Sequence, residues 1–122
     1  MAFHNTSLYV VAGTDDSEVF NDFHRFSLDS FMWETLHPSA KYAPVFLAGA
    51  ATYNDYFYIF FGWSEEEGSS SSEVYRASLL TDFEWETVDV SENLLGINSF
   101  GFSLVDTRFV TFGGHTGSSL TN

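Results

Sequence analysis

The sequence contains no cysteine, only 4 basic residues against 17 acidic ones, and no long apolar run. Without cysteine the chain has no disulfide, no thiol catalysis and no cysteine-ligated zinc. No stretch approaches the ~20 apolar residues that a membrane helix needs. The first residues also lack the basic region and apolar run of a signal peptide. We therefore expect an intracellular, cytoplasmic protein.

The shortage of basic residues leaves a net charge of −13 and a pI near 4.2. A surface this negative repels phosphate backbones and anionic membranes. We expect neither nucleic acid nor membrane as a partner. A protein with a basic surface, or a cation, fits this charge better.

Aromatic residues are abundant, with 14 Phe, 6 Tyr and 3 Trp in 122 residues. They occur in short apolar runs, at 8–12, 57–61 and 109–112, and each run ends at a glycine: Gly13, Gly62 or the pair Gly113 and Gly114. Such runs are typical of β-strands. Each run is apolar on both faces, so each strand is expected to be covered on both sides.

These landmarks recur with a period of about 50 residues. Gly13, Gly62 and Gly114 are spaced by 49 and 52 residues, and Trp33-Glu34-Thr35-Leu36 recurs 52 residues later as Trp85-Glu86-Thr87-Val88. Arg25 to Leu28 recurs as Arg76 to Leu79. A period of this length with several strands per repeat is typical of a β-propeller blade.

The repeating unit resembles a kelch repeat. The resemblance lies in an apolar strand ending in a double glycine (Phe109 to Gly114), an Asn-Asp-aromatic strand (21–28), and a strand opened by Trp33 or Trp85. It covers nearly the whole chain, although Ala12 and Phe61 stand where the first glycine would be. It implies an all-β fold with propeller blades of four antiparallel strands, with the repeated glycines as structural positions. The exact recurrence of Trp33 and Trp85 predicts for both a structural role between blades.

The predicted division is a first blade over 1–40, a complete blade over 41–92 and two strands of a third over 93–122. The first blade has strands at about 8–13, 20–28 and 32–36, with a first strand absent or reduced to Ala2-Phe3. The second has strands at about 46–53, 57–62, 73–79 and 84–88, and the third at about 99–105 and 109–113.

This makes about two and a half blades, whereas propellers close with 4–8. Either further blades complete the propeller, or copies of the chain assemble into a ring. In such a ring the C-terminal strands would pair with the third and fourth strands of a neighbour's first blade.

Hairpin topology places the loops after each second strand at one end of the blades, together with the connections between blades. The family resemblance implies that this end carries the ligand, and loops on a rigid scaffold commonly bind partners. The candidate partner-binding residues there are Thr14, Asp15, Asp16, Trp63, Ser64, Glu65, His115, Lys41 and Tyr42, with Asn98 and Ser99 beside them.

Trp63 is the strongest candidate for a binding hot spot in this set, because an aromatic side chain at the start of an exposed loop is suited to anchor a partner. Packing against a neighbouring blade is the alternative. The acidic loop residues are suited to attract a basic partner or to bind calcium, or they are simply hydrated at the surface. The segment Gly68 to Ser72 is expected to be a flexible insertion.

No catalytic motif, metal-ligand spacing or cofactor motif is present in the sequence, so we expect no cofactor and no enzyme activity. The preferred function is a protein–protein interaction or scaffold module. One alternative is part of a kelch-like propeller enzyme with its active site in the channel. The other is a structural subunit, packed within a large complex or self-assembling into a ring.

Overall fold

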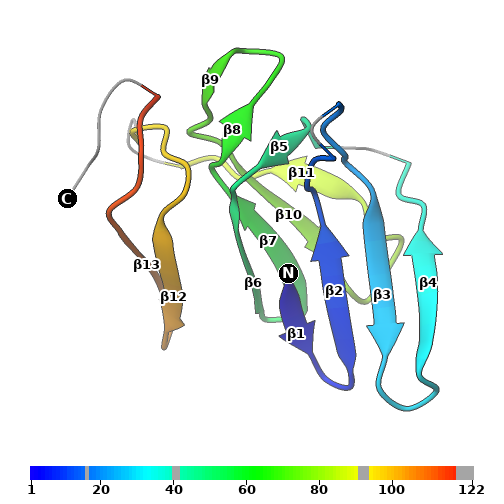
Figure 1. Ribbon diagram of the computed structural model, residues 1–122. Helices are drawn as coiled ribbons and strands as arrows, with labels where there is room; N and C mark the ends of the chain where they lie inside the picture. The colour runs from blue at the N-terminus through cyan, green and yellow to red at the C-terminus, as the bar shows by residue number, and fades with distance from the viewer. Residues whose placement is uncertain (16, 40–41, 91–93, 118–122) are drawn as a thin grey trace.

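The strands of the described residues all pair antiparallel. The computed structural model describes residues 1–15, 17–39, 42–90 and 94–117, and these form several small sheets, two of them with four strands (Figure 1). The predicted all-β antiparallel class is confirmed. The described residues form no closed propeller. The division into blades at residues 40 and 92 stays a prediction.

The first sheet contains, in spatial order, β1 (Ala2–His4), β2 (Ser7–Val11), β3 (Phe23–Ser27) and β4 (Met32–Leu36). The short first strand expected at Ala2-Phe3 is thus present. Because β3 pairs with β2 on one side and β4 on the other, it has no free edge. The predicted pairing of a neighbour's C-terminal strands with β3 and β4 would have to displace β1 and β2.

The second sheet contains β6 (Gly49–Tyr53), β7 (Tyr56–Phe60), β10 (Val74–Ser78) and β11 (Trp85–Thr87), and the third hairpin contains β12 (Gly101–Val105) and β13 (Arg108–Phe112). In the described part of the chain β13 pairs with β12 alone. The strands β1, β6 and β12, which begin the three units, lie next to one another.

A small extra sheet extends one end of the second sheet. It pairs β5 (Val45–Phe46) with β8 (Trp63–Ser64), and β8 with β9 (Ser69–Ser70). The expectation of a flexible insertion from Gly68 to Ser72 is therefore wrong. Its Ser69 and Ser70 pair with β8, and the buried Ser71 donates its N–H to the carbonyl of Gly62 at 2.8 Å.

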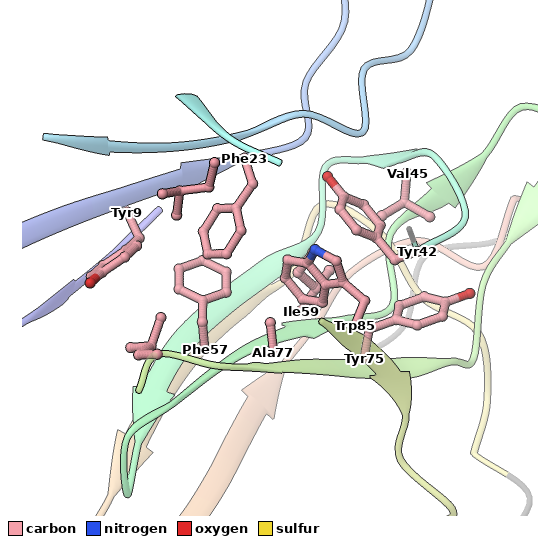
Figure 2. Close-up of a cluster of buried hydrophobic side chains, with 11 residues drawn as sticks. Tyr9, Phe23, Tyr42, Val45, Phe57, Ile59, Tyr75, Ala77 and Trp85 are labelled. Carbon is pink, nitrogen blue, oxygen red and sulfur yellow. The ribbon is translucent and has the colours of Figure 1, made fainter. Parts of the chain in front are cut away.

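Strand β7 is covered on both faces, as its sequence predicts. Phe57 and Ile59 enter the core between the first and second sheets, where the ring of Phe23 lies 5.4 Å from Phe57 and 5.3 Å from Trp85 (Figure 2). On the other face Phe60 packs against Phe109 of the third hairpin at 4.2 Å. The second sheet is thus sandwiched between the other two units.

A ladder of Tyr, Arg and Glu explains why Arg and Glu recur in the repeat. Arg25 lies between Tyr9 and Glu34 on neighbouring strands of the first sheet, and it forms an ion pair with Glu34. In the second sheet Arg76 lies between Tyr58 and Glu86, with Nε 2.6 Å from the carboxylate of Glu86. Each ladder joins three strands of one sheet.

The glycines that mark each repeat lie where the backbone adopts positive φ angles. Three successive pairs have positive φ: Ala12 and Gly13 (59° and 127°), Phe61 and Gly62 (55° and 100°), and Gly113 and Gly114 (65° and 111°). The left-handed region suits glycine. Ala12 and Phe61 adopt the same left-handed conformation, so the bend is kept in the two repeats that lack the first glycine.

The two repeated tryptophans differ in burial. Trp85 is 6% exposed between the first and second sheets, as its predicted structural role requires, whereas Trp33 is 59% exposed and its ring packs at a tilt against Phe26 of its own sheet. Trp33 lies on the first sheet's outer face, which no other described element covers.

We predict that Trp85→Ala costs about 3–5 kcal/mol of unfolding free energy, because it leaves a cavity in the core. The matched substitution Trp33→Ala should cost below about 1 kcal/mol, as exposed sites do. Urea unfolding of both variants measures the difference. Equal losses would show that the outer face of the first sheet is covered in solution.

A second matched pair tests the glycine positions. Gly13→Ala meets nothing within 4 Å and should cost about 1–2 kcal/mol of backbone strain. Gly62→Ala places a Cβ 2.9 Å from the carbonyl oxygen of Phe46 and from the Cβ of Ala48, so roughly 1–3 kcal/mol is added by crowding. Urea unfolding compares them, and equal costs would contradict the close approach at Gly62.

Candidate functional site

The loops that follow β2 and β7 and the segment that follows β13 lie at the same end of the molecule, opposite the β1–β2 and β3–β4 turns (Figure 1). This is the arrangement that hairpin topology predicts. The backbones of these loops are ordered by short pairings, Thr14 with Val19 in the first and β8 with β9 in the second. A bridge between Asn98 and His115 has the same place in the third.

A hollow of about 220 Å³ lies between the first two of these loops. It is lined by Thr14, Ser17, Glu18, Val19, Phe46, Trp63 and Glu65. The structure thus brings together three residues that the sequence predicts for the binding face: Thr14, Trp63 and Glu65. Phe46 and Val19 were not predicted, because they are apolar and only the pairing of β5 with β8 brings Phe46 beside Trp63.

An adjoining hollow of about 340 Å³ makes the mouth of this site acidic. It shares Ser17, Glu18, Val19 and Glu65 with the first hollow and adds Pro44 and Glu66. Three carboxylates therefore surround an opening with an aromatic wall. Such an arrangement attracts a cationic group, since a cation is favoured both by the carboxylates and by the face of an indole ring.

Trp63 is partly buried and held from several sides. Its backbone pairs with Phe46 and Ser70, and its six-membered ring lies against Gly117, where an added Cβ would come within 3.2 Å of Cζ3. The indole is therefore fixed in position while it lines the hollow. Trp63 thus packs against Gly117 and also lines the hollow, and its role in binding stays a prediction.

Asp15 organises the first loop rather than lining the hollow. Its Oδ1 accepts hydrogen bonds from the hydroxyl of Ser17 at 2.6 Å and from the backbone N–H groups of Ser17 and Glu18 at 3.0 and 3.1 Å. The Ser17 hydroxyl, followed by these backbone donors, lowers the pKa of Asp15 below its ordinary 3.8. The ionised carboxylate thus holds Ser17 and Glu18 in place at the mouth.

Two predicted binding residues are buried, and these predictions are wrong. Tyr42 is 2% exposed and packs its ring on Trp85 at 4.7 Å inside the core, where burial raises the pKa of its phenol (Figure 2). Ser64 is 3% exposed, and its hydroxyl accepts the N–H of Glu67 across the turn between β8 and β9. Asp16 and Lys41 lie outside the described residues.

The third loop is tied to the second by a buried amide. Asn98 is 6% exposed and donates from Nδ2 to the hydroxyl of Ser70 at 2.8 Å and to the carbonyl of His115 at 3.0 Å. Ser99 donates its hydroxyl to the Asn98 side-chain oxygen at 2.8 Å. The ring of His115 accepts the N–H of Gly117. These residues connect the loops at this end of the molecule without lining the hollow.

No cluster of three or more His, Asp or Glu side chains suited to a metal ion occurs among the described residues. In the same part of the chain there is no helix with the length and apolar character to cross a membrane. Comparison with protein families and with curated proteins finds no match to this chain.

We predict that Ser17→Ala raises the pKa of Asp15 toward 3.8, because the strongest donor is lost while the backbone donors remain. Since the folded pKa is depressed, the loop gains stability from Asp15 above its unfolded pKa and loses it as pH falls through the folded value. Carboxyl-carbon NMR titration of both proteins measures the shift. An unchanged Asp15 pKa would contradict the hydroxyl contact.

Proposed function

We propose that the chain is a kelch-type propeller segment that acts as a protein-interaction module and binds a partner through a basic side chain. The observation that carries this proposal is the hollow between the first two loops. It combines the indole of Trp63 with Glu18 and Glu65 at one opening. An arginine side chain fits this chemistry, because its planar guanidinium stacks on aromatic rings and binds carboxylates.

The arrangement of the three units supports the propeller part of the proposal. The two sheets and the hairpin pack face to face in sequence order, and their first strands lie side by side. In a propeller, first strands line the central channel and the loops after the second strands share one end. The repeated ladder and the repeated left-handed bend show that the units are built alike.

A structural role is the second candidate, and the first sheet's outer face favours it. Phe3 and Trp33 are both more than half exposed on that face. Exposed apolar area of this kind is typical of surfaces that pack against another sheet. A neighbouring subunit or a further blade would cover it.

We predict that an arginine-containing peptide, Gly-Gly-Arg-Gly-Gly with blocked ends, shifts the indole N–H resonance of Trp63 in NMR titrations. Trp63→Ala should weaken binding about tenfold, since a partly desolvated cation–π contact is worth about 1–2 kcal/mol. The double change Glu18→Gln and Glu65→Gln should weaken it further. Trp63→Phe keeps an aromatic wall and should retain part of the affinity.

The control is Asp82→Asn with Asp29→Asn, which removes the same charge at the opposite end of the sheets. It should leave the affinity nearly unchanged. If it weakens binding as much as the Glu18 and Glu65 pair, the peptide is held by net charge alone and the hollow is not the site. Far-UV circular dichroism of each variant checks that the fold is retained.

A further inference from the structure

The hollow beside Trp63 is lined by two short ladders, one from each of the first two loops. Phe46 and Trp63 are paired residues of β5 and β8, and Thr14 and Val19 form the bridge of the first loop. Paired residues of antiparallel strands direct their side chains to the same face of their ladder. Two aromatic side chains from one ladder and Val19 with Thr14 from the other therefore enclose the same space.

The apolar walls offer no partner to the N–H groups of a cation. The side chains of Val19, Phe46 and Trp63 have no hydrogen-bond acceptor, and Pro44 extends the apolar lining into the adjoining hollow. An arginine head group carries five N–H donors. Each donor that turns toward these walls loses its water without gaining a partner, and this loss lowers the affinity.

The carboxylates of the site lie on its exposed side. Glu18, Glu65 and Glu66 are exposed, whereas the three apolar wall residues are partly buried. None of the described residues that line either hollow is basic. Exposed ion pairs contribute little to affinity, because water and salt screen them. The carboxylates thus admit any cation, and contact with the apolar walls decides which cation binds most tightly.

We propose that this hollow selects asymmetric dimethylarginine in a partner polypeptide, an inference that rests on the function proposed above. Methylation keeps the positive charge of the guanidinium and replaces N–H donors with methyl groups. The asymmetric form carries both methyl groups on one terminal nitrogen. That end suits the apolar walls, and the unmodified edge, with Nε–H and the other terminal NH₂, suits the carboxylates of Glu18 and Glu65.

Other methylated cations match the two parts of the site less well. Symmetric dimethylarginine has one methyl group on each terminal nitrogen, so a single methyl reaches the walls when the Nε edge faces the carboxylates. Trimethyllysine has no N–H group for the carboxylates and no planar face for the indole of Trp63. The expected order of affinity is therefore asymmetric, then symmetric, then unmodified arginine.

Four peptides with blocked ends test this order. They are Gly-Gly-Arg-Gly-Gly with its arginine unmodified, asymmetrically dimethylated, symmetrically dimethylated, or replaced by the neutral citrulline. Each is titrated into the 122-residue chain while NMR follows the indole N–H resonance of Trp63. The three arginine forms carry the same charge, so attraction by the net charge of −13 cancels from their comparison.

A buried methyl group is worth roughly fourfold in affinity. We therefore expect the asymmetric peptide to bind about tenfold more tightly than the unmodified one, with the symmetric peptide between them. The citrulline peptide should not bind measurably, because it keeps the shape of arginine without its charge.

Two adjacent apolar residues provide a matched control. Phe46→Ala removes part of the aromatic wall, whereas Leu47→Ala changes a residue that is 54% exposed and lines neither hollow. The first should reduce the tenfold preference to about twofold, and the second should leave it unchanged. Val19→Ser makes the other ladder polar without removing an aromatic ring and should also reduce the preference. Far-UV circular dichroism checks that each variant is folded.

Free asymmetric dimethylarginine separates a polypeptide partner from a small molecule. Its α-carboxylate is repelled by the carboxylates of the site, so the free amino acid should bind more weakly than the peptide. Equal or tighter binding of the free amino acid would overturn the polypeptide partner.

The outcomes separate this inference from the proposed function. If the unmodified peptide binds as tightly as the dimethylated one, selection for methylation is wrong and the proposed function stands. If no peptide shifts the Trp63 resonance, both are wrong. If the preference survives both Phe46→Ala and Val19→Ser, the walls of the hollow are not its source and the inference is overturned.

Discussion

The fold depends on one packing constraint: a sheet that is apolar on both faces has to be covered on both. Strand β7 meets it by directing Phe57 and Ile59 to the first sheet and Phe60 to the third hairpin. The second sheet is therefore the only one of the three units whose two apolar faces are both packed within the described residues. The exposure of Trp33 and an apolar groove beside Phe109 of β13 are the two places where the same constraint is unmet.

Much of the fold could be predicted because its causes are local and repeated. Apolar runs ending in glycine were enough to place β2, β7 and β13. The left-handed pairs at Ala12–Gly13, Phe61–Gly62 and Gly113–Gly114 show why that pattern marks a bend. The sequence shows that Arg25 and Glu34 both recur in the next repeat. It does not show that they face each other on paired strands, because that depends on the strand register.

The site was predicted less well because it depends on contacts between units. Thr14, Trp63 and Glu65 follow from topology alone. The predictions for Tyr42 and Ser64 were wrong because a position in a loop does not reveal whether a side chain is buried. The ring of Tyr42 points into the core, and the hydroxyl of Ser64 accepts a hydrogen bond within a turn. Phe46 was missed since its partner strand, β8, lies beyond the expected end of the apolar run. The serine-rich segment was misjudged because pairing with β8 overrides its composition.

The Tyr–Arg–Glu ladders have a consequence outside the core. Arg25 and Arg76 are two of the chain's 4 basic residues, and both are neutralised by a carboxylate within their own sheet. Neither guanidinium is therefore available to an anionic molecule, and the field at a distance is that of the net charge of −13. Encounter with a cationic molecule is accelerated at low ionic strength and slows as the Debye length shortens to about 8 Å at physiological ionic strength. The same pairs that join the strands thus also occupy two of the few groups that could bind an anion.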